Sequence, residues 1–256
     1  MGTIEAIVLV VAGFAVGYIN TIAGGATIIS LSVLMFMGMP LNVANGTHRI
    51  AAAFQTFVSV SVFRAKGALD LRKGLKLGLP AVTGSLLGAY LGVEINEEVF
   101  SKLIGMVMVG LLALLLFRPK LWLNPQSHLQ RKPVSVKQVI IFFALGFYGG
   151  FLYVGIGYFL LAALALSAGY DLVRANAVKV LIVMLYVPFS LAVYIWGGLI
   201  DWQAGLALAA GQGIGAWAGV QSAVTRGAGF IRWFMIIFLL ISILQIFGFV
   251  DFAGFF

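Results

Sequence analysis

Long and short apolar runs follow one another along the chain, and short polar intervals separate them. Most runs are close to the ~20 residues that an α-helix needs to cross a bilayer. These longer segments lie at 4–22, 44–63, 74–92 and 99–117 in the first half, and at 138–154, 173–196, 204–224 and 229–249 in the second. The pattern predicts an all-α, polytopic membrane helical bundle with about 8–10 transmembrane helices.

A shorter apolar segment follows the first long run of each half. Segment 27–39 comes after the glycine-containing stretch 23–26, and segment 158–167 comes after the similar stretch 155–157. At 1.5 Å per residue, the first of them reaches roughly 20 Å, which is too short for ~30 Å of hydrocarbon. We therefore expect the first two segments of each half to be short or re-entrant.

The two halves repeat one another at a fixed spacing. A shift of 131 residues, without a gap, aligns many glycines and several polar residues, among them Asn45 with Asn176 and Asp70 with Asp201. Such a sustained register indicates an internal duplication. We predict a first membrane repeat at 1–117, a linker at 118–137 and a second membrane repeat at 138–256.

The repeats are expected to be inverted. Each half has five segments, and an odd number places the second half in the membrane from the opposite face. The interval after segment 44–63 is rich in Lys and Arg, whereas the equivalent stretch, 197–203, has Asp201 as its one charged residue. Because basic loops stay in the cytoplasm, we place the linker there and both termini on the extracytoplasmic side of a cell inner membrane.

The composition narrows the class of protein. Hydrophobic residues make up 62% of the chain and charged residues 9%, against about 25% charged in soluble domains, so we expect a multi-pass integral membrane protein. The net charge of +8 is explained by basic loops and not by nucleic acid. The chain has no cysteine, which excludes disulfides, thiolate metal sites and cysteine nucleophiles. The first run has no basic residue before it and does not resemble a cleaved signal peptide.

The two breaks are candidate anion sites. A helix that restarts inside the membrane has unpaired N–H groups with partial positive charge at its start, and glycine lets an anion come close to them. The residues of this kind are Gly24, Gly25, Ala26, Thr27, Gly155 and Gly157. The alternative is that these glycines only allow helices to pack closely.

Three basic side chains lie in apolar segments, namely His48, Arg49 and Lys179. A charged side chain in the bilayer costs roughly 2.5 to 3.5 kcal/mol unless it is paired or functional. Glu5 and Asp171 lie near segment ends and can pair with one of the three, which leaves positive charge for an anionic ligand. The alternative for His48 and Arg49 is that they extend to the nearby interface.

Neutral polar residues accompany these bases. Helical spacing places Asn45, His48 and Gln55 on one face, and the second half repeats that spacing. The remaining candidates for the binding site are Thr47, Asn176 and Tyr186. Since the first half brings two bases and the second half only Lys179, we expect a ligand nearer the first repeat.

We expect no enzyme activity, because no acid is placed to orient His48 and the Gly-Ser elbow motifs are absent. No residue pattern indicates a metal or cofactor.

Five short motifs resemble a known family. They are GYINTIAGG at 17–25, GMP at 38–40, ANGTHR at 44–49, VRANAVKV at 173–180 and GGLIDW at 197–202. Together they are similar to the two repeats of the TauE/SafE (TSUP) family of sulfite and organosulfonate exporters, over nearly the whole chain. The resemblance implies an inner-membrane carrier for sulfur-containing or related organic anions.

These observations lead to one functional prediction. We expect a secondary membrane transporter of small sulfur-containing or organic anions, such as sulfite or sulfonates, that exports them by alternating access around a basic site at the midplane. Two alternatives stay open, a non-transporting membrane scaffold or assembly subunit and a passive anion channel. The expected partners are a small anionic substrate and the lipid bilayer, with no nucleic acid, and a homodimer is compatible with the sequence.

Overall fold

The computed structural model describes residues 2–91, 108–130 and 132–246, and all regular structure in these ranges is helical. The helices are α1 (Thr3–Ile22), α2 (Thr27–Phe36), α3 (Leu41–Ala65), α4 (Leu71–Leu91), the segment Met108–Phe117, α6 (Lys120–Leu123), α7 (Ser127–Gln130), α8 (Val136–Phe151), α9 (Ile156–Ala168), α10 (Leu172–Trp196) and α11 (Trp202–Ile246). The chain is therefore an all-α membrane bundle, as predicted. Parts of the predicted segments 74–92, 99–117 and 229–249 lie outside the described residues.

Length and apolar character together identify the candidate spanning helices, since α3 and α4 are long but less apolar. Within the described ranges, α1, α10 and residues 202–244 of α11 are long and apolar enough to cross a membrane. The second segment of each half is short, with 10 residues in α2 and 13 in α9. The first segments are longer, with 20 residues in α1 and 16 in α8. The expectation of short segments therefore holds for α2, α8 and α9 and not for α1.

The backbone repeats at the spacing seen in the sequence. α3 and α10 each have 25 residues, and their first residues are Leu41 and Leu172. Three glycine pairs at this spacing are left-handed in both halves: Gly24 and Gly155 (φ 77° and 70°), Gly38 and Gly169 (86° and 77°), and Gly67 and Gly198 (69° and 68°). Because this conformation is costly with a side chain, it accounts for glycine at these positions.

The matched aspartates have one structural role. Asp70 Oδ1 accepts a hydrogen bond from the Lys73 backbone N–H at 3.0 Å, and Asp201 Oδ1 accepts one from Ala204 N–H at 3.0 Å. Each carboxylate thus caps the start of the fourth helix of its half, α4 or α11. The Asp70–Asp201 match is explained by helix capping and not by ligand binding.

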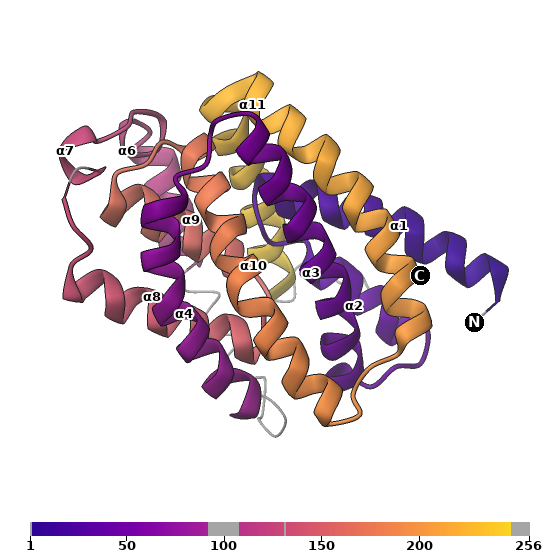
Figure 1. Cartoon of the computed structure of the whole chain (residues 1–256). Helices are drawn as coiled ribbons and strands as arrows, with labels where there is room; N and C mark the ends of the chain where they lie inside the picture. Colours follow the sequence, from indigo (N-terminus) through magenta and orange to yellow (C-terminus); the bar gives the residue numbers. More distant parts are fainter. Residues whose placement is uncertain (1, 92–107, 131, 247–256) are drawn as a thin grey trace.

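The two halves are interleaved. α1 packs along α11 and α8 packs along α4, so the first helix of each half lies against the fourth helix of the other (Figure 1). Glycines line both seams: a Cβ on Gly211 would lie 2.0 Å from Val10 O, and one on Gly84 would lie 2.1 Å from Phe143 O. Small residues allow this close approach of helix backbones in a membrane.

α11 consists of two helical stretches. Gly227 has φ 76° and ψ −172°, which interrupts the helix between 202–226 and 228–246. The two stretches match the predicted segments at 204–224 and 229–249 as far as the description extends. Figure 1 shows the chain reversing direction at this point, at the end of the molecule where α6 also lies.

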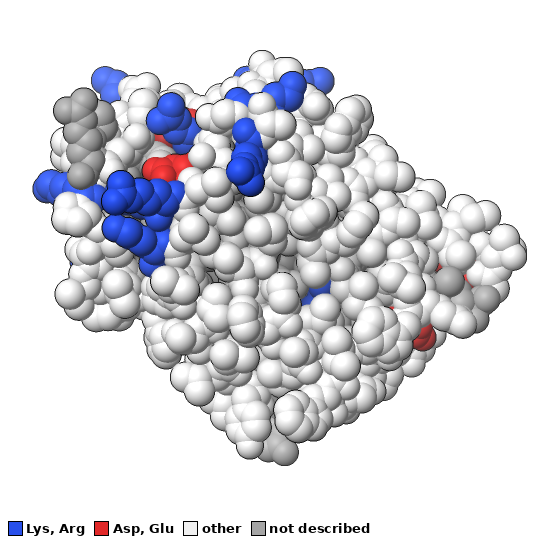
Figure 2. Space-filling model, viewed as in Figure 1, with Lys and Arg blue, Asp and Glu red and all other residues white. Residues whose placement is uncertain are grey.

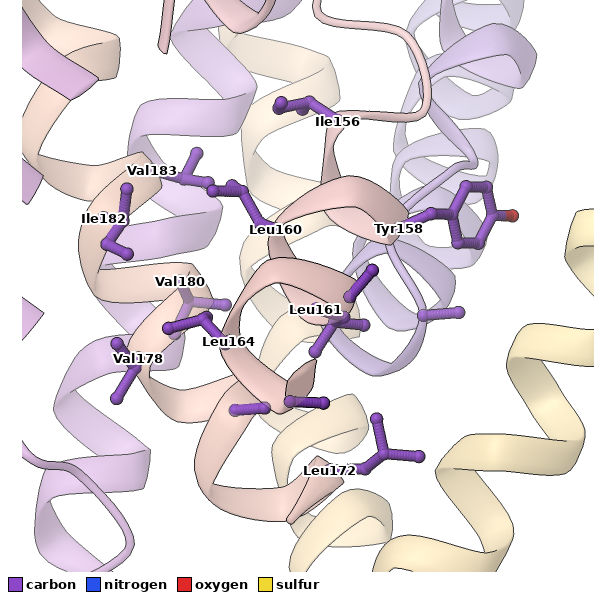
Figure 3. Packing of buried hydrophobic residues seen from close by; sticks show 14 of the residues in the cluster. Ile156, Tyr158, Leu160, Leu161, Leu164, Leu172, Val178, Val180, Ile182 and Val183 are labelled. Carbon is purple, nitrogen blue, oxygen red and sulfur yellow. The ribbon is translucent and has the colours of Figure 1, made fainter. Parts of the chain in front are cut away.

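The apolar core surrounds α9. Leu160, Leu161 and Leu164 are fully buried there. Figure 3 shows Leu160 and Leu164 extending toward Val180 and Val183 of α10, whereas Tyr158 extends to the opposite side of α9. A short helix thus lies inside the bundle, enclosed by longer helices.

Lys and Arg gather at one end of the molecule, where α6, α7 and the start of α4 lie (Figure 2). The linker is held to α4 there, because Lys73 Nζ donates to Leu129 O and Gln130 O at 3.0 Å. Tyr170, in the loop before α10, donates to Asp70 at 2.7 Å. Burial, together with the neighbouring Asp70 carboxylate, raises the pKa of Tyr170 and keeps this donor protonated. The positions of the linker and the termini relative to the membrane stay predictions.

Candidate functional site

The two helix breaks meet in the centre of the bundle. A Cβ built on Gly157 would lie 2.4 Å from the Cα of Gly24, and one on Gly25 would lie 2.1 Å from the Tyr158 hydroxyl oxygen. Segments that are more than 130 residues apart thus contact each other through their backbones. Close packing, the alternative noted for these glycines, is therefore one of their roles.

Alanine at Gly157 is expected to destabilise the protein. Its Cβ would overlap backbone atoms of Gly24, which cannot rotate away, and overpacking of this kind costs about 1–3 kcal/mol. Gly229 offers a matched control, because its Cβ would meet nothing within 4 Å and alanine favours a helix by about 1 kcal/mol over glycine. Thermal unfolding in detergent should show a lower Tm for Gly157→Ala and an unchanged or higher Tm for Gly229→Ala. Equal Tm values would contradict the close approach.

The two breaks differ in how their amide groups are satisfied. In the first break, Asn20 Oδ1 accepts hydrogen bonds from the backbone N–H groups of Gly25 (2.9 Å) and Ala26 (2.8 Å). Neither α2 nor α9 has a side-chain cap on its first turn, and no side-chain oxygen of the described residues is bonded to the amides before α9 as Asn20 is to those before α2. The amide end of α9 is therefore the better candidate for an anion, since a side-chain oxygen already occupies the other.

A small cavity lined by both polar and apolar residues lies between the breaks. It has a volume of about 30 Å³, enough for one or two water molecules. Its walls come from both halves: Asn20, Gly24, Gly25, Thr27, Gln55, Thr56, Tyr153, Gly155, Ile156, Gly157, Lys179, Val180 and Val183. His48 and Arg49 are not among these residues. A second, larger groove lies between α4 and α8 and is lined by apolar residues such as Leu79 and Phe143, which suits lipid chains and not an anion.

Lys179 is the basic residue of the cavity. Its side chain is 2% exposed, and Nζ donates to Asn20 O at 2.9 Å and Thr21 O at 3.2 Å. Both carbonyls belong to the last turn of α1, whose final carbonyl groups have no partner within the helix. An ammonium has three N–H donors, so these two bonds leave one for a ligand.

Arg49 makes the corresponding contacts with the end of α8. Its guanidinium donates to Gly150 O at 2.6 Å and Gly149 O at 3.4 Å, and also to Ser190 Oγ at 2.8 Å. The rings of Tyr153 and Tyr194 lie 5.5 and 4.6 Å from Cζ. Arg49 is fully buried, so it does not extend to the interface.

The asparagines complete this arrangement. Asn45 Nδ2 donates to Phe151 O at 3.3 Å, and Asn176 Nδ2 donates to Ile22 O at 3.1 Å. Phe151 and Ile22 are the last residues of α8 and α1. In each half, therefore, one cation and one asparagine bind the last three carbonyls of the broken helix of the other half. The residue that plays the part of Lys179 in the first half is Arg49 and not its aligned match, His48.

His48 lies beside the cavity in a separate polar contact. Its Nδ1 is 2.7 Å from Ser30 Oγ and 3.4 Å from Gln212 Nε2, and the tautomer decides which atom donates. The ring meets that of Tyr153 at a centroid distance of 5.3 Å. Nε2 is buried without a hydrogen-bond partner within the protein, so His48 keeps one polar atom unused.

Of the other predicted residues, some line the cavity and some do not. Thr47 Oγ1 accepts from Asp201 N–H at 2.9 Å and supports the loop before α11, not the cavity. Gln55 lines the cavity, and its Oε1 has no hydrogen-bond partner within the protein. Tyr186 is buried beside Tyr153 with an unpartnered hydroxyl, and Ala26 lies just outside the cavity wall. The structure thus brings Gly24, Gly25, Thr27, Gln55, Gly155, Gly157 and Lys179 together.

No carboxylate among the described residues pairs with Arg49 or Lys179. Glu5 Oε2 accepts from Gly2 N–H at 2.7 Å, and Asp171 Oδ1 accepts from Val173 N–H and Arg174 N–H at the start of α10. The pairing considered for these two acids therefore does not form. Since Asp70 and Asp201 also cap helices, the described part of the core holds cations without anionic partners.

Several residues that line the cavity were missed in the sequence, among them Asn20, Thr56 and Tyr153. Asn20 could have been noticed, because it is an amide in an otherwise apolar run shortly before the first break. Tyr153 gave no signal: it is the one non-glycine residue in the described ranges with positive φ, at 63°. That backbone costs about 1–2 kcal/mol, and strain of this size is typical of functional sites. Tyr153 separates the cavity from His48 and Arg49.

Comparisons with known proteins indicate the family of the chain. A family model described as Sulfite exporter TauE/SafE matches residues 9–246. A probable membrane transporter protein of Haemophilus influenzae is 29% identical over 225 residues, which cover 88% of this chain and 88% of the relative. YfcA of Escherichia coli K12, also called a probable membrane transporter protein, is 26% identical over 218 residues, or 84% of this chain and 80% of YfcA. ORF9 of a Sinorhizobium species, with the same description, is 24% identical over 229 residues, or 90% of this chain and 87% of ORF9. No solved structure gives a significant match to the chain.

Proposed function

The chain belongs to the TauE/SafE sulfite exporter family, and from this membership we propose that it is a secondary transporter that exports small anions such as sulfite or sulfonates. The negative head of the substrate binds in the cavity between the helix breaks. The names of the relatives, probable membrane transporter proteins, support transport without naming a substrate. The proposal includes no catalytic step.

One observation carries this assignment: Lys179 is a buried cation that lines the cavity, and no carboxylate among the described residues pairs with it. A buried charge without an ionic partner is costly. Carbonyl groups of α1 stabilise the ammonium but do not neutralise it. An anion in the cavity would do so, and this favours a negatively charged substrate over a neutral or cationic one.

The cavity provides further groups for an oxyanion. The first residues of α9, Ile156 and Gly157, line its wall, and the amide groups at a helix start favour negative charge. Gln55 and Thr27 add neutral polar atoms that can bond substrate oxygens. The substrate therefore lies between Lys179 and the start of α9, in contact with both halves, and away from His48 and Arg49.

Transport requires the structure to change. The cavity of about 30 Å³ is too small for a sulfonate, so the described conformation is a closed one. The two breaks touch over a small area, at Gly24 with Gly157 and at Gly25 with Tyr158, and each half binds the other through a cation. Movement of one half against the other would therefore open the cavity to one side at a time. This is the alternating access expected of inverted repeats.

Anion-dependent stability tests the proposal directly. Sulfite at about ten times its Kd should stabilise the purified protein by about 1.4 kcal/mol, which raises the Tm by roughly 3–6 °C. Chloride at equal ionic strength is the control for salt effects, and a panel of sulfonates ranks the substrates. A scaffold protein would show the same Tm in sulfite, sulfonate and chloride, and this result would reject the assignment.

Flux measurements separate a carrier from a channel. In proteoliposomes, a carrier shows saturable uptake of labelled sulfite that is accelerated by unlabelled sulfite on the other side. A passive anion channel shows conductance without exchange. We expect saturation and exchange.

A further inference from the structure

The carbonyl end of α1 has the chemistry of a monovalent cation site, and Lys179 fills it. We infer that the Lys179 ammonium takes the place of a bound coupling cation, so that anion transport needs no sodium or other free cation. This inference rests on the proposed function and adds to it the cation requirement of transport. A cation that belongs to the protein is not transported with the substrate.

Lys179 forms hydrogen bonds with the carbonyl end of α1, the group that attracts cations at a helix end. Nζ lies 2.9 Å from Asn20 O and 3.2 Å from Thr21 O, and the amide of Asn176 takes the next carbonyl, Ile22 O, at 3.1 Å. In carriers with broken membrane helices, carbonyl ends of half-helices coordinate the coupling ion, while amide ends hold the anionic part of the substrate. Here an ammonium on α10 takes the first role.

The second observation is the position of Lys179 between the two helix ends. The ammonium contacts the carbonyl end of α1 and lines the cavity that the start of α9 also lines. Four charged or partly charged groups then follow one another through the site: the carbonyl end of α1, the Lys179 ammonium, the substrate anion and the amide end of α9. Each group is next to one of opposite sign. In this order the ammonium performs the task of a bound sodium ion.

The other broken helix offers no free cation site either. Arg49 binds Gly149 O and Gly150 O, and Asn45 binds Phe151 O. The last three carbonyls of both α1 and α8 are therefore occupied by protein side chains. The two ends differ in one respect, because Lys179 lines the cavity and Arg49 does not.

The test is the cation requirement of the wild-type protein and of Lys179→Ala. In proteoliposomes, wild-type sulfite flux should be unchanged when sodium and potassium are replaced by choline on both sides. Lys179→Ala removes the ammonium and leaves room for a small cation at the same carbonyls. Its flux should fall by about tenfold or more, and sodium, ethylammonium or propylammonium should restore a large part of it. Lys66→Ala, an exposed residue of the basic end, is the control and should match the wild type.

The outcomes distinguish this inference from the proposed function. Wild-type sulfite flux that occurs in sodium and stops in choline would overturn the inference, and the proposed anion transport would still stand. An absence of saturable anion flux in every buffer would overturn the proposed function. A binding measurement that does not require transport completes the test: ethylammonium should raise the Tm of Lys179→Ala more than that of the wild type. An equal response of both proteins would show that the carbonyls do not form a cation site.

Discussion

Replacing Lys179 by glutamine is expected to reduce anion flux by at least about tenfold, the largest effect on transport of any single substitution in the site. Glutamine is of similar length and can still donate to a carbonyl, but it carries no charge. A hydrogen bond to a charged group contributes about 1.5–3 kcal/mol, and 1.4 kcal/mol corresponds to a factor of ten in affinity. The loss should appear mainly as a higher KM for sulfite, because Lys179 lines the cavity where the substrate binds.

The measurement is initial uptake of labelled sulfite into proteoliposomes over a range of concentrations. Lys66→Gln is the matched control, since Lys66 is basic and exposed at the end of α3, and it should transport like the wild type. The sulfite-dependent rise in Tm should also disappear in Lys179→Gln. Unchanged flux and an unchanged Tm response would exclude Lys179 from the site.

Replacing Arg49 by glutamine is expected to act on stability first. Arg49 binds Gly149 O, Gly150 O and Ser190 Oγ, and its guanidinium lies over the Tyr194 ring. Glutamine leaves part of the carbonyl end of α8 unsatisfied, and each unsatisfied buried group costs about 1–3 kcal/mol. We expect a loss of roughly 2–5 kcal/mol in the free energy of unfolding.

Lysine should not restore this loss. A guanidinium presents planar paired donors and stacks on aromatic rings, which an ammonium does not do. Arg49→Lys is therefore expected to stay clearly less stable than the wild type, whereas Arg64→Gln, at an exposed position, should unfold normally. Unfolding in detergent at fixed lipid content measures these differences. A stable Arg49→Gln protein with a raised KM for sulfite would instead assign Arg49 to the substrate.

These two substitutions separate roles that the sequence groups together. His48, Arg49 and Lys179 looked alike as bases in apolar segments, and the alignment of the halves pairs His48 with Lys179. The structure pairs Arg49 with Lys179, because residues three and four positions after an asparagine lie on the same helix face. His48 instead contacts Ser30 and Gln212. Residue type and spacing could not decide between i+3 and i+4.

Much of the fold follows from local properties of the sequence. Apolar length predicts the helices, because a bilayer requires each spanning segment to satisfy its own backbone. Glycine identifies the left-handed turns at Gly24, Gly38 and Gly67 and their partners, since side chains disfavour that backbone. Because the chain is duplicated, each of these predictions applies once in each half. The short helices α2 and α9 were expected because both halves have a short apolar segment after a glycine-containing break.

The composition of the site depends on contacts between distant parts of the chain. Every residue has a carbonyl group, so no residue type reveals that Lys179 binds Asn20 O or that Arg49 binds Gly150 O across more than 100 residues. Only the interleaving of α1 with α11 and of α4 with α8 brings each cation to the end of the opposite broken helix. The sequence alone predicts a transporter-like helical bundle with buried bases. The tertiary structure decides which base faces the cavity, because burial and pairing are set by packing between the halves.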